Sequence, residues 1–404
     1  MPNPNHLYPS GDDAYAPSRA DGPYAVGPDA HDGPDDAPGP LTARTLTLAI
    51  SGGLSVLLLL VIMLVPLPYA VERPGPTVDT LGELDGHPLI TVDGAETYPT
   101  SGELRLTTVS TVGGPGHPVT AGDVVRAWVL GSETVVPREA VFSPSETSEE
   151  IAQRGEAQML SSQTNATVAA LTELGYDIPM TLTVSAVAEE SGAAGQIEVD
   201  DVITGIAAPG GQVEDVADYQ QLVGTLGEVP PGETVQVRVE RGGAEEVVEV
   251  VTTAPPVDAS GAPVQEGSLL GVGILPDPDV PVDIAFDIDR IGGPSAGTMF
   301  ALAIIDMLTE GEMTGGEEIA GTGTMDLAGR VGPIGGIRKK MVGAVDDGAE
   351  WFLAPAANCA ETVGYVPDGL QVVRVTTLAE AQTAVEEIAA GRGDELPGCE
   401  AVGD

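Results

Sequence analysis

An apolar run at residues 46–65, LTLAISGGLSVLLLLVIMLV, constrains this chain more than any other feature of its sequence. No charged residue occurs from position 45 to position 71. A helix of about 20 such residues covers the roughly 30 Å of hydrocarbon in a bilayer. A cleaved signal peptide is the alternative, but its apolar region is usually shorter and does not follow a long acidic segment. We therefore predict an uncleaved membrane-spanning helix over residues 45–66.

The segment before this run has the composition of a disordered tail. Residues 1–44 are rich in Pro, Gly, Asp and Ala and have almost no aliphatic side chain before Leu41. Such a segment cannot bury enough apolar surface to fold. The flanking charges orient the span only weakly, because Arg19 and Arg44 on one side face Arg73 on the other.

The charge of the chain excludes one class of partner. The 404 residues are 42% hydrophobic, which is enough for the cores of two or three domains, and the net charge is −46. Since no basic patch of useful size occurs, we expect no nucleic-acid partner. The acidity otherwise indicates a solvated surface and says little about the fold.

Ser295 stands where a reactive serine can be activated. Gly292 and Gly293 let the backbone bend, and Pro294 presets the dihedral angle of a first helical turn. An apolar run at helical spacing follows, namely Met299, Ala301, Leu302, Ala303, Ile305 and Leu308. The unpaired N–H groups and the positive dipole end of a helix N-terminus stabilise an oxyanion. The sequence thus predicts Ser295 as a candidate nucleophile.

A serine nucleophile needs a base, and the residue types present restrict the choice. The histidines all lie at or before position 117: His6, His31, His87 and His117. A Ser-His pair would therefore recruit His87 or His117 from a distant region. Lys339 and Lys340 are the chain's two lysines, and a desolvated lysine can lose its proton whereas arginine cannot. The alternative, in which Ser295 only caps a helix and the lysines form a solvated face, remains open from the residues alone.

Three motifs resemble one protein family. GGPSAG at residues 292–297, GTG at 321–323 and GRVGPIGGIRKK at 329–340 are similar, in this order, to the peptidase domain of Lon proteases. More narrowly, the chain resembles the membrane-anchored, PDZ-containing Lon-like serine proteases of Gram-positive bacteria. The resemblance is strongest over residues 269–385. It implies a cytoplasmic N-terminus and C-terminal domains outside the cell membrane.

The resemblance also implies roles for individual residues. Ser295 is the nucleophile, and Lys340 occupies the second basic position of the family's GG-x-K-x-K pattern, with Arg338 in the first. Thr322 matches the threonine that helps hold the lysine amine. Ala296, beside the serine, is counted as a supporting residue. The resemblance implies no metal and no cofactor.

Two departures from full-length Lon machines follow from the sequence. Many Lon domains carry an acidic residue three positions before the serine, where this chain has Gly292, so gating by that carboxylate is absent. A Walker A loop requires Gly-Lys-Ser/Thr, but Lys339 follows Arg338 and Lys340 precedes Met341. We therefore expect no ATP binding and an ATP-independent enzyme.

The sequence patterns divide the rest of the chain into three segments. Residues 70–174 are expected to form an extracytoplasmic connector, with short strands in RPGPTVDTLG, LITVDG, ELRLTTVSTV and VVRAWVL and a helix over residues 148–175. Residues 175–255 resemble a PDZ domain, in the order strand, loop, strand, helix, strand, strand. The Lon-like peptidase domain is expected over residues 266–395, opening with strands in LLGVGILP and VDIAFDIDRI.

The PDZ resemblance implies a kind of partner. PDZ domains add a peptide strand to a sheet edge and capture a C-terminal carboxylate, and LGYDI at residues 174–178 is the candidate carboxylate loop. We therefore expect polypeptide substrates, presented in part through their C-terminal peptides. A closed β-rich spacer is the alternative for this segment. The sequence does not specify a subunit number, so an oligomer remains open.

The two cysteines, Cys359 and Cys399, lie near the C-terminus and have no metal-binding spacing. In an oxidising compartment they can form one disulfide that ties the C-terminal tail to the last domain. Two unrelated thiols are the alternative.

Together these patterns predict an α+β multidomain protein. Its parts are one N-terminal transmembrane helix, a PDZ-like β-rich domain and a C-terminal Lon-type α/β peptidase domain. The expected function is that of an ATP-independent, membrane-anchored serine endopeptidase with a Ser295/Lys340 dyad. The alternative is a non-catalytic PDZ-type membrane adaptor that keeps a Lon-like scaffold.

Overall fold

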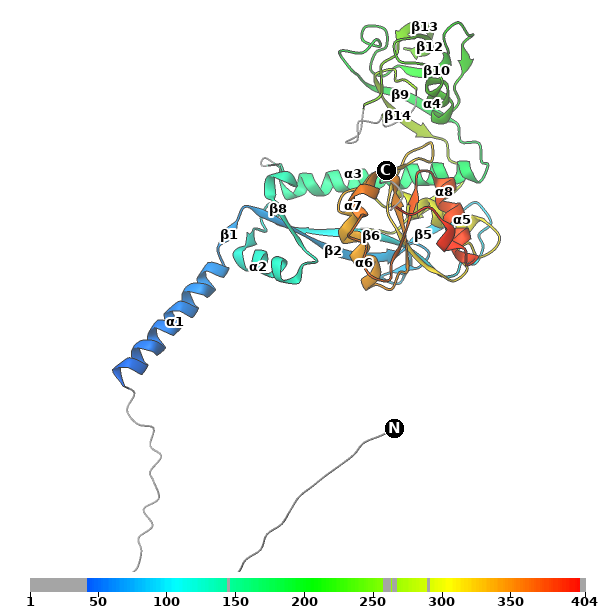
Figure 1. Cartoon of the computed structure of the whole chain (residues 1–404). Helices are drawn as coiled ribbons and strands as arrows, with labels where there is room; N and C mark the ends of the chain where they lie inside the picture. Colours follow the sequence, from blue (N-terminus) through cyan, green and yellow to red (C-terminus); the bar gives the residue numbers. More distant parts are fainter. Residues whose placement is uncertain (1–41, 144–145, 257–262, 264–266, 289–290, 400–404) are drawn as a thin grey trace, which may run out of the picture. The chain divides into compact units, whose positions relative to one another are not determined.

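A computed structural model gives the architecture of the chain (Figure 1). The structure describes residues 42–143, 146–256, 263, 267–288 and 291–399. The tail predicted to be disordered therefore lies almost entirely outside the described residues. The chain divides into two compact units, residues 1–58 and 59–404, and each is described by itself.

The apolar run near the N-terminus forms one helix. Helix α1 (Ala43–Met63) has 21 residues, its most apolar stretch of 18 residues has a mean hydropathy of 2.5, and none of its residues is buried. Its length and composition meet the requirement for crossing a bilayer. Among the described residues, this is the one helix that does so.

A mixed sheet carries the core of the second unit. Its strand order is β20-β19-β16-β6-β2-β8, in which β6, β16, β19 and β20 pair in parallel and β2 pairs antiparallel with both β6 and β8. The strands are β20 (Gln371–Val375), β19 (Trp351–Pro355), β16 (Glu318–Gly321), β6 (Glu103–Val112), β2 (Tyr69–Asp79) and β8 (Thr134–Pro137).

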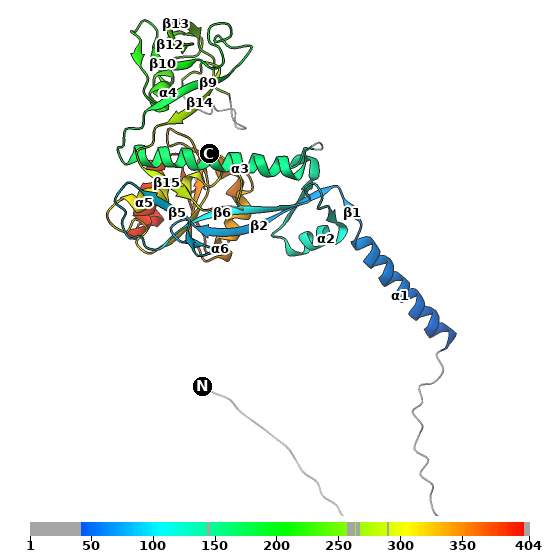
Figure 2. The ribbon, with the colours of Figure 1, turned by 180° about the vertical axis from the view of Figure 1, so that it is seen from behind.

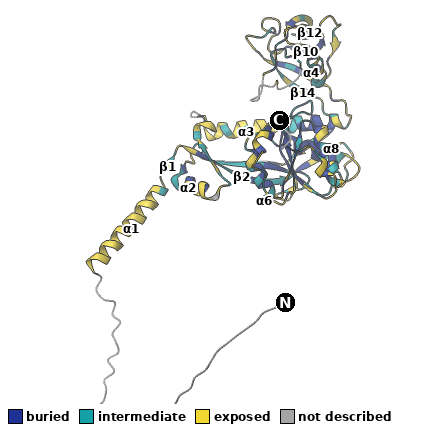
Figure 3. Cartoon of the chain, viewed as in Figure 1, coloured by how far each residue is buried: buried dark blue, intermediate teal, exposed yellow. Residues whose placement is uncertain are grey.

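Helices cover both faces of this sheet. On one face α3 (Ser148–Glu173), α5 (Gly297–Leu308) and α8 (Leu378–Ala389) pack together, and on the other lies α6 (Ile337–Asp346). Successive residues of a strand serve opposite faces: Ile319 packs with α5, whereas Ala320 packs with α6. Figures 1 and 2 show β2 and β6 between α3 and α6, and Figure 3 shows the buried interior of the sheet. A parallel sheet buried on both faces is the usual arrangement in α/β domains.

The prediction that residues 70–174 form a connector separate from the peptidase domain is wrong. Its strands β2 and β6 hydrogen-bond into the mixed sheet, and its helix α3 packs on α5. The peptidase fold therefore requires residues on both sides of the PDZ-like segment. One element type is also wrong: VVRAWVL forms helix α2 (Ala121–Leu130), which begins at a capping box between Thr120 and Asp123.

The PDZ-like segment has its own sheet and its own core. The sheet order is β13-β12-β10-β9-β14, with β11 beside β10. Its elements are β9 (Met180–Val187), β10 (Val202–Ala207), β11 (Glu214–Asp215), α4 (Tyr219–Gly227), β12 (Thr234–Arg241), β13 (Ala244–Val251) and β14 (Val272–Pro278). Apart from the two-residue strand β11, the order from β9 to β13 is the one predicted.

Two predictions about this segment are corrected. LLGVGILP does not open the peptidase domain, because it supplies β14, whose partner is β9 of the PDZ-like sheet. LGYDI is the C-terminal turn of α3, where the Tyr176 N–H donates to the Leu171 carbonyl at 2.9 Å.

Smaller elements complete the second unit. They are β1 (Pro66–Leu67), β3 (Glu83–Leu84), β4 (His87–Pro88), β5 (Ile90–Asp93), β7 (Val119–Thr120), β15 (Asp283–Phe286), β17 (Thr324–Met325), β18 (Val331–Gly332), α7 (Cys359–Thr362) and the 3₁₀ turns Arg138–Ala140, Ala356–Asn358 and Gly393–Glu395. Cys359 and Cys399 form the predicted disulfide. Both cysteines are buried in the cluster that packs under α6.

Candidate active site

Ser295 lies in the turn immediately before α5. The N-cap of α5 is Ala296, which makes no side-chain capping bond, so Ser295 does not serve as the cap. The side chain of Ser295 is half-buried, and the helix behind it is buried from Gly297 to Asp306. The turn thus presents a partly accessible hydroxyl on a rigid support.

Lys340 comes to the serine from the other face of the sheet. It is the fourth residue of α6, and only 3% of it is exposed. Its Nζ lies 2.7 Å from Ser295 Oγ, 2.8 Å from Thr322 Oγ1 and 2.9 Å from the Thr107 carbonyl oxygen. Thr322 directly follows β16, so the two helices meet where that strand ends. The structure therefore brings Ser295, Lys340 and Thr322 together, as the family resemblance implied.

The hydrogen bonds around Lys340 determine how a neutral amine would be oriented. The Thr107 carbonyl can only accept, and the Thr322 hydroxyl donates its own hydrogen to the Ser295 carbonyl at 3.0 Å. Both contacts to Lys340 Nζ consequently use an N–H. A neutral amine has two hydrogens, so its lone pair is left for the Ser295 hydroxyl. This is the arrangement that a general base requires.

Burial also changes the acidity of this lysine. Desolvation lowers the pKa of the Lys340 ammonium from 10.5 to about 7. Because burial disfavours the charged form, the amine is neutral for a large fraction of the time near pH 7. Burial also lowers the pKa of Lys339, which is only half-buried. The cavity at Ser295 includes Lys340 but not Lys339 among its lining residues.

The GTG motif is explained by close packing. A Cβ at Gly323 would collide with Thr298 Oγ1, and the φ of Gly323 is 159°. The Gly323 N–H donates to the Ser295 carbonyl at 2.9 Å. The residues that follow β16 therefore fix the serine backbone through its carbonyl.

Helix α3 holds the serine loop in ways the sequence did not reveal. Ser162 Oγ donates to the Pro294 carbonyl at 3.1 Å, and the Gly293 N–H donates to the Gly155 carbonyl at 3.1 Å. A Cβ at Gly292 would come within 3.3 Å of Gly155 Cα. This close approach of two backbones explains why a side chain is disfavoured at the position where many Lon domains carry an acid.

A cavity of about 340 Å³ opens at the serine and lysine. Ala296 lines it together with Ser295 and Lys340. Neither His87 nor His117 is among its lining residues. Of the residues considered as a base, the structure thus places Lys340 at this cavity.

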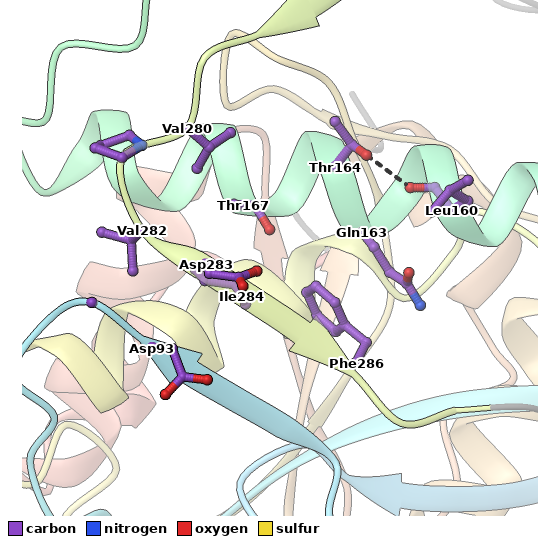
Figure 4. Close-up of a pocket in the computed structure, with 12 residues that line it drawn as sticks. Asp93, Leu160, Gln163, Thr164, Thr167, Val280, Val282, Asp283, Ile284 and Phe286 are labelled. Carbon is purple, nitrogen blue, oxygen red and sulfur yellow. Dashed lines mark hydrogen bonds between the residues drawn. The ribbon is translucent and has the colours of Figure 1, made fainter.

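Two further cavities follow α3 away from the serine. One of about 850 Å³ shares Met159 with the cavity at the serine, and one of about 610 Å³ shares Leu160, Gln163 and Phe286 with the former. In Figure 4, Gln163 and Phe286 face the space between α3 and β15. The three cavities form a continuous series along one helix.

Similarity to known proteins agrees with this geometry. Residues 287–388 match the Lon protease (S16) C-terminal proteolytic domain. Lon protease homolog 2, peroxisomal, from Caenorhabditis elegans is 30% identical over 128 residues, which are 32% of this chain and 16% of that protein. Lon protease from Phenylobacterium zucineum is 31% identical over 119 residues, or 29% and 15% of the two chains. The chain thus spans less than a fifth of the length of these relatives.

Solved structures similar to this chain include two PDZ domains. The PDZ domain of the SdrC-like protein from Listeria monocytogenes is 21% identical, covers 24% of this chain and 87% of its own, and has a TM-score of 0.19. That of the SdrC-like protein from Listeria innocua is 27% identical, covers 22% and 91%, and has a TM-score of 0.18. The match over residues 287–388, together with the Lon relatives, shows that the C-terminal part of this chain is similar to the Lon protease (S16) proteolytic domain.

Proposed function

We propose that this chain is an ATP-independent, membrane-anchored serine endopeptidase in which Ser295 is the nucleophile and Lys340 the general base. The observation that carries the proposal is the 2.7 Å contact between Ser295 Oγ and Nζ of Lys340, a residue that is only 3% exposed. Desolvation is the cause of the lowered pKa of Lys340, so burial keeps this amine neutral for part of the time near pH 7.

The geometry supports a two-step acyl transfer. Neutral Lys340 takes the hydroxyl proton while Ser295 Oγ attacks the carbonyl carbon of the substrate. We infer that the backbone N–H of Ala296, directly before α5, helps to stabilise the oxyanion. The protonated amine then gives its proton to the departing amine of the substrate, which leaves an acyl-enzyme. Lys340 next takes a proton from a water molecule while the water oxygen attacks the acyl carbon. The bond between that carbon and Ser295 Oγ then breaks, the proton passes from Lys340 to Ser295 Oγ, and the acid product leaves.

The cavities along α3 suit an extended polypeptide. A folded substrate could not enter a space of about 340 Å³ at the serine. We infer that the substrate is unfolded or locally exposed and lies along α3. This agrees with a chain that has no Walker A loop to drive unfolding.

The PDZ-like segment has an edge that could receive a peptide. Strand β14 ends the sheet order and pairs with β9 alone. Leu275 on β14 is 65% exposed, and the Ser268 N–H before the strand donates to Leu226 at the end of α4. We propose that peptides with a free C-terminal carboxylate bind along β14. Full-length Ser295→Ala should bind such peptides more tightly than their amidated forms, whereas equal binding would leave the segment structural.

Active-site labelling tests the enzyme against the adaptor. A serine-directed phosphonate reacts only with an activated hydroxyl. The full chain should be labelled and Ser295→Ala should not, at equal protein concentration. If the folded full chain resists labelling, the non-catalytic adaptor is the better description.

A further inference from the structure

Helix α2 has apolar side chains on two faces, one buried and one exposed. On the inner face Val124 and Ala127 are buried against Val71 and Val119. On the outer face lie Val125, Trp128 and Val129, whose exposed fractions are 40%, 73% and 79%. These three residues have the spacing i, i+3, i+4 and therefore form one stripe. A helix on the surface of a soluble domain normally carries polar residues there.

The position of α2 along the chain indicates what covers this stripe. The Ala121 N–H donates to the Val65 carbonyl at 2.9 Å, and β1 pairs with β7 directly before α2 (Figure 1). Val65 is the last residue of the apolar run. Helix α2 therefore begins one hydrogen bond away from the point where the chain leaves that run.

The short length of α2 limits how far the stripe can lie from Val65, where the apolar run ends. At 1.5 Å per residue, Val125 and Val129 lie about 6 and 12 Å along the helix axis from Ala121. The apolar run matches the roughly 30 Å of hydrocarbon, and the headgroup layer adds about 5–8 Å on each side. The stripe consequently lies within or next to the headgroup layer.

The chemistry of α2 suits this layer as well. Tryptophan is enriched at membrane interfaces because its ring is apolar while its N–H can bond to water or headgroups. The charged residues of α2 already have partners: Asp123 bonds to Thr120, and Arg126 forms a 3.1 Å ion pair with Glu133. Little charge therefore needs to be desolvated.

We propose that the stripe of Val125, Trp128 and Val129 inserts into the lipid interface and gives the folded part of the chain a second attachment to the bilayer. The proposal rests on the proposed membrane anchoring by α1. The bilayer is the occupant, rather than a second copy of the chain, because the stripe follows the apolar run so closely.

Tryptophan fluorescence tests the proposal on the full chain. The chain has two tryptophans, Trp128 and Trp351, and Trp351 is half-buried in β19. Full chain and Trp128→Phe are reconstituted in phosphatidylcholine vesicles, with or without bromine on the acyl chains near the headgroups. The difference between the two proteins gives the emission of Trp128. We expect this emission to lose most of its intensity in the brominated vesicles, and Trp128→Phe to be unaffected.

The other outcomes would overturn the proposal, and each shows what surrounds Trp128 instead of lipid. If Trp128 is unaffected by bromine and is quenched by aqueous acrylamide, it faces water. If it is shielded from both quenchers, a protein surface covers it, as in contact with a second copy. Flotation with the vesicles distinguishes failure of the two proposals. A chain that does not float contradicts membrane anchoring itself. A floating chain whose Trp128 is not quenched by bromine contradicts only the insertion of the stripe.

As a matched variant, Val129→Asp changes an exposed position and should leave the fold intact. Because it places a charge in the stripe, it should reduce the quenching of Trp128 by brominated lipid. Unchanged quenching in Val129→Asp would contradict insertion of this face.

Discussion

Lys340 performs its proposed task because of where its amine is buried. Desolvation lowers the pKa of Lys340 to about 7, so a large fraction of its amine is unprotonated near neutral pH. Thr107 and Thr322 bind the two hydrogens of the neutral amine, so its lone pair faces Ser295. Acidity and orientation thus come from separate parts of the same environment.

The pH dependence of the reaction follows from this lowered pKa. Only the neutral amine can accept the serine proton, so kcat/KM should rise with pH through a midpoint near 7 and then level off. The measurement is the initial rate of fluorogenic peptide hydrolysis across pH 5 to 9, with circular dichroism as the control for folding. A rate that falls over this range would exclude a neutral lysine as the base.

Thr322 should act as a positioning residue. Thr322→Val keeps the shape but removes the hydroxyl that bonds Lys340 and the Ser295 carbonyl. We expect kcat to fall about 10- to 100-fold, because a misplaced catalytic group costs rate. Thr322→Ser restores the hydroxyl and should recover most of the activity, and the midpoint of the pH profile should shift in Thr322→Val alone. Equal loss in both variants would indicate a packing defect instead.

The helices and strands show which parts of this architecture local sequence can predict. The positions of α3 and α5 were predicted from apolar spacing, since these helices each bury one face or more. The strand in LLGVGILP was also expected, but its partner β9 lies about 90 residues earlier, and alternation does not encode pairing. In VVRAWVL, the β-branched residues favoured a strand, although Thr120 and Asp123 already formed the signature of a helix start.

The candidate site likewise contains residues that sequence motifs reveal and residues that only the structure reveals. Ser295, Lys340 and Thr322 stand in motifs that resemble a family, so they could be named before the structure was known. Thr107 could not, because it contributes a carbonyl, which every residue has. The role of α3 depends on the contact between Gly155 and Gly292, which are far apart in sequence.

The disulfide should stabilise the helix that carries the lysine. It closes a loop with a sequence separation of 40 and lies in the same buried cluster as Ile337 and Met341 of α6. Loop-closure entropy predicts a loss of about 4 kcal/mol in the free energy of unfolding for the double variant Cys359→Ser, Cys399→Ser. The melting temperature with and without reductant checks this. Reductant should lower it in the unmodified chain and leave the double variant unchanged; an insensitive unmodified chain would mean that the two thiols are free.

For the whole molecule, the disulfide and the apolar helix both suggest that the C-terminal domains lie outside the cytoplasm. A stable disulfide is typical of proteins outside the cytoplasm. We propose that α1 spans the cell membrane with residues 1–44 in the cytoplasm and the C-terminal domains outside.

Topology can be tested with epitopes at both ends. Protease added to intact protoplasts should remove a C-terminal epitope and spare an N-terminal one, because the bilayer protects the cytoplasmic side. Detergent-lysed protoplasts provide the control, in which both epitopes should be lost. Protection of the C-terminal epitope in intact protoplasts, with loss of the N-terminal one, would reverse the proposed orientation.

The two adjacent lysines allow a matched test of the dyad. Lys340→Arg keeps the positive charge but cannot accept the serine proton, whereas Lys339→Arg changes a residue that does not line the site. Turnover of a fluorogenic peptide should be abolished in Lys340→Arg, to the level of Ser295→Ala, and nearly unchanged in Lys339→Arg, with all three proteins folded by circular dichroism. Retained turnover in folded Lys340→Arg would contradict the Ser295/Lys340 dyad, and full loss in Lys339→Arg alone would assign the base to the other lysine.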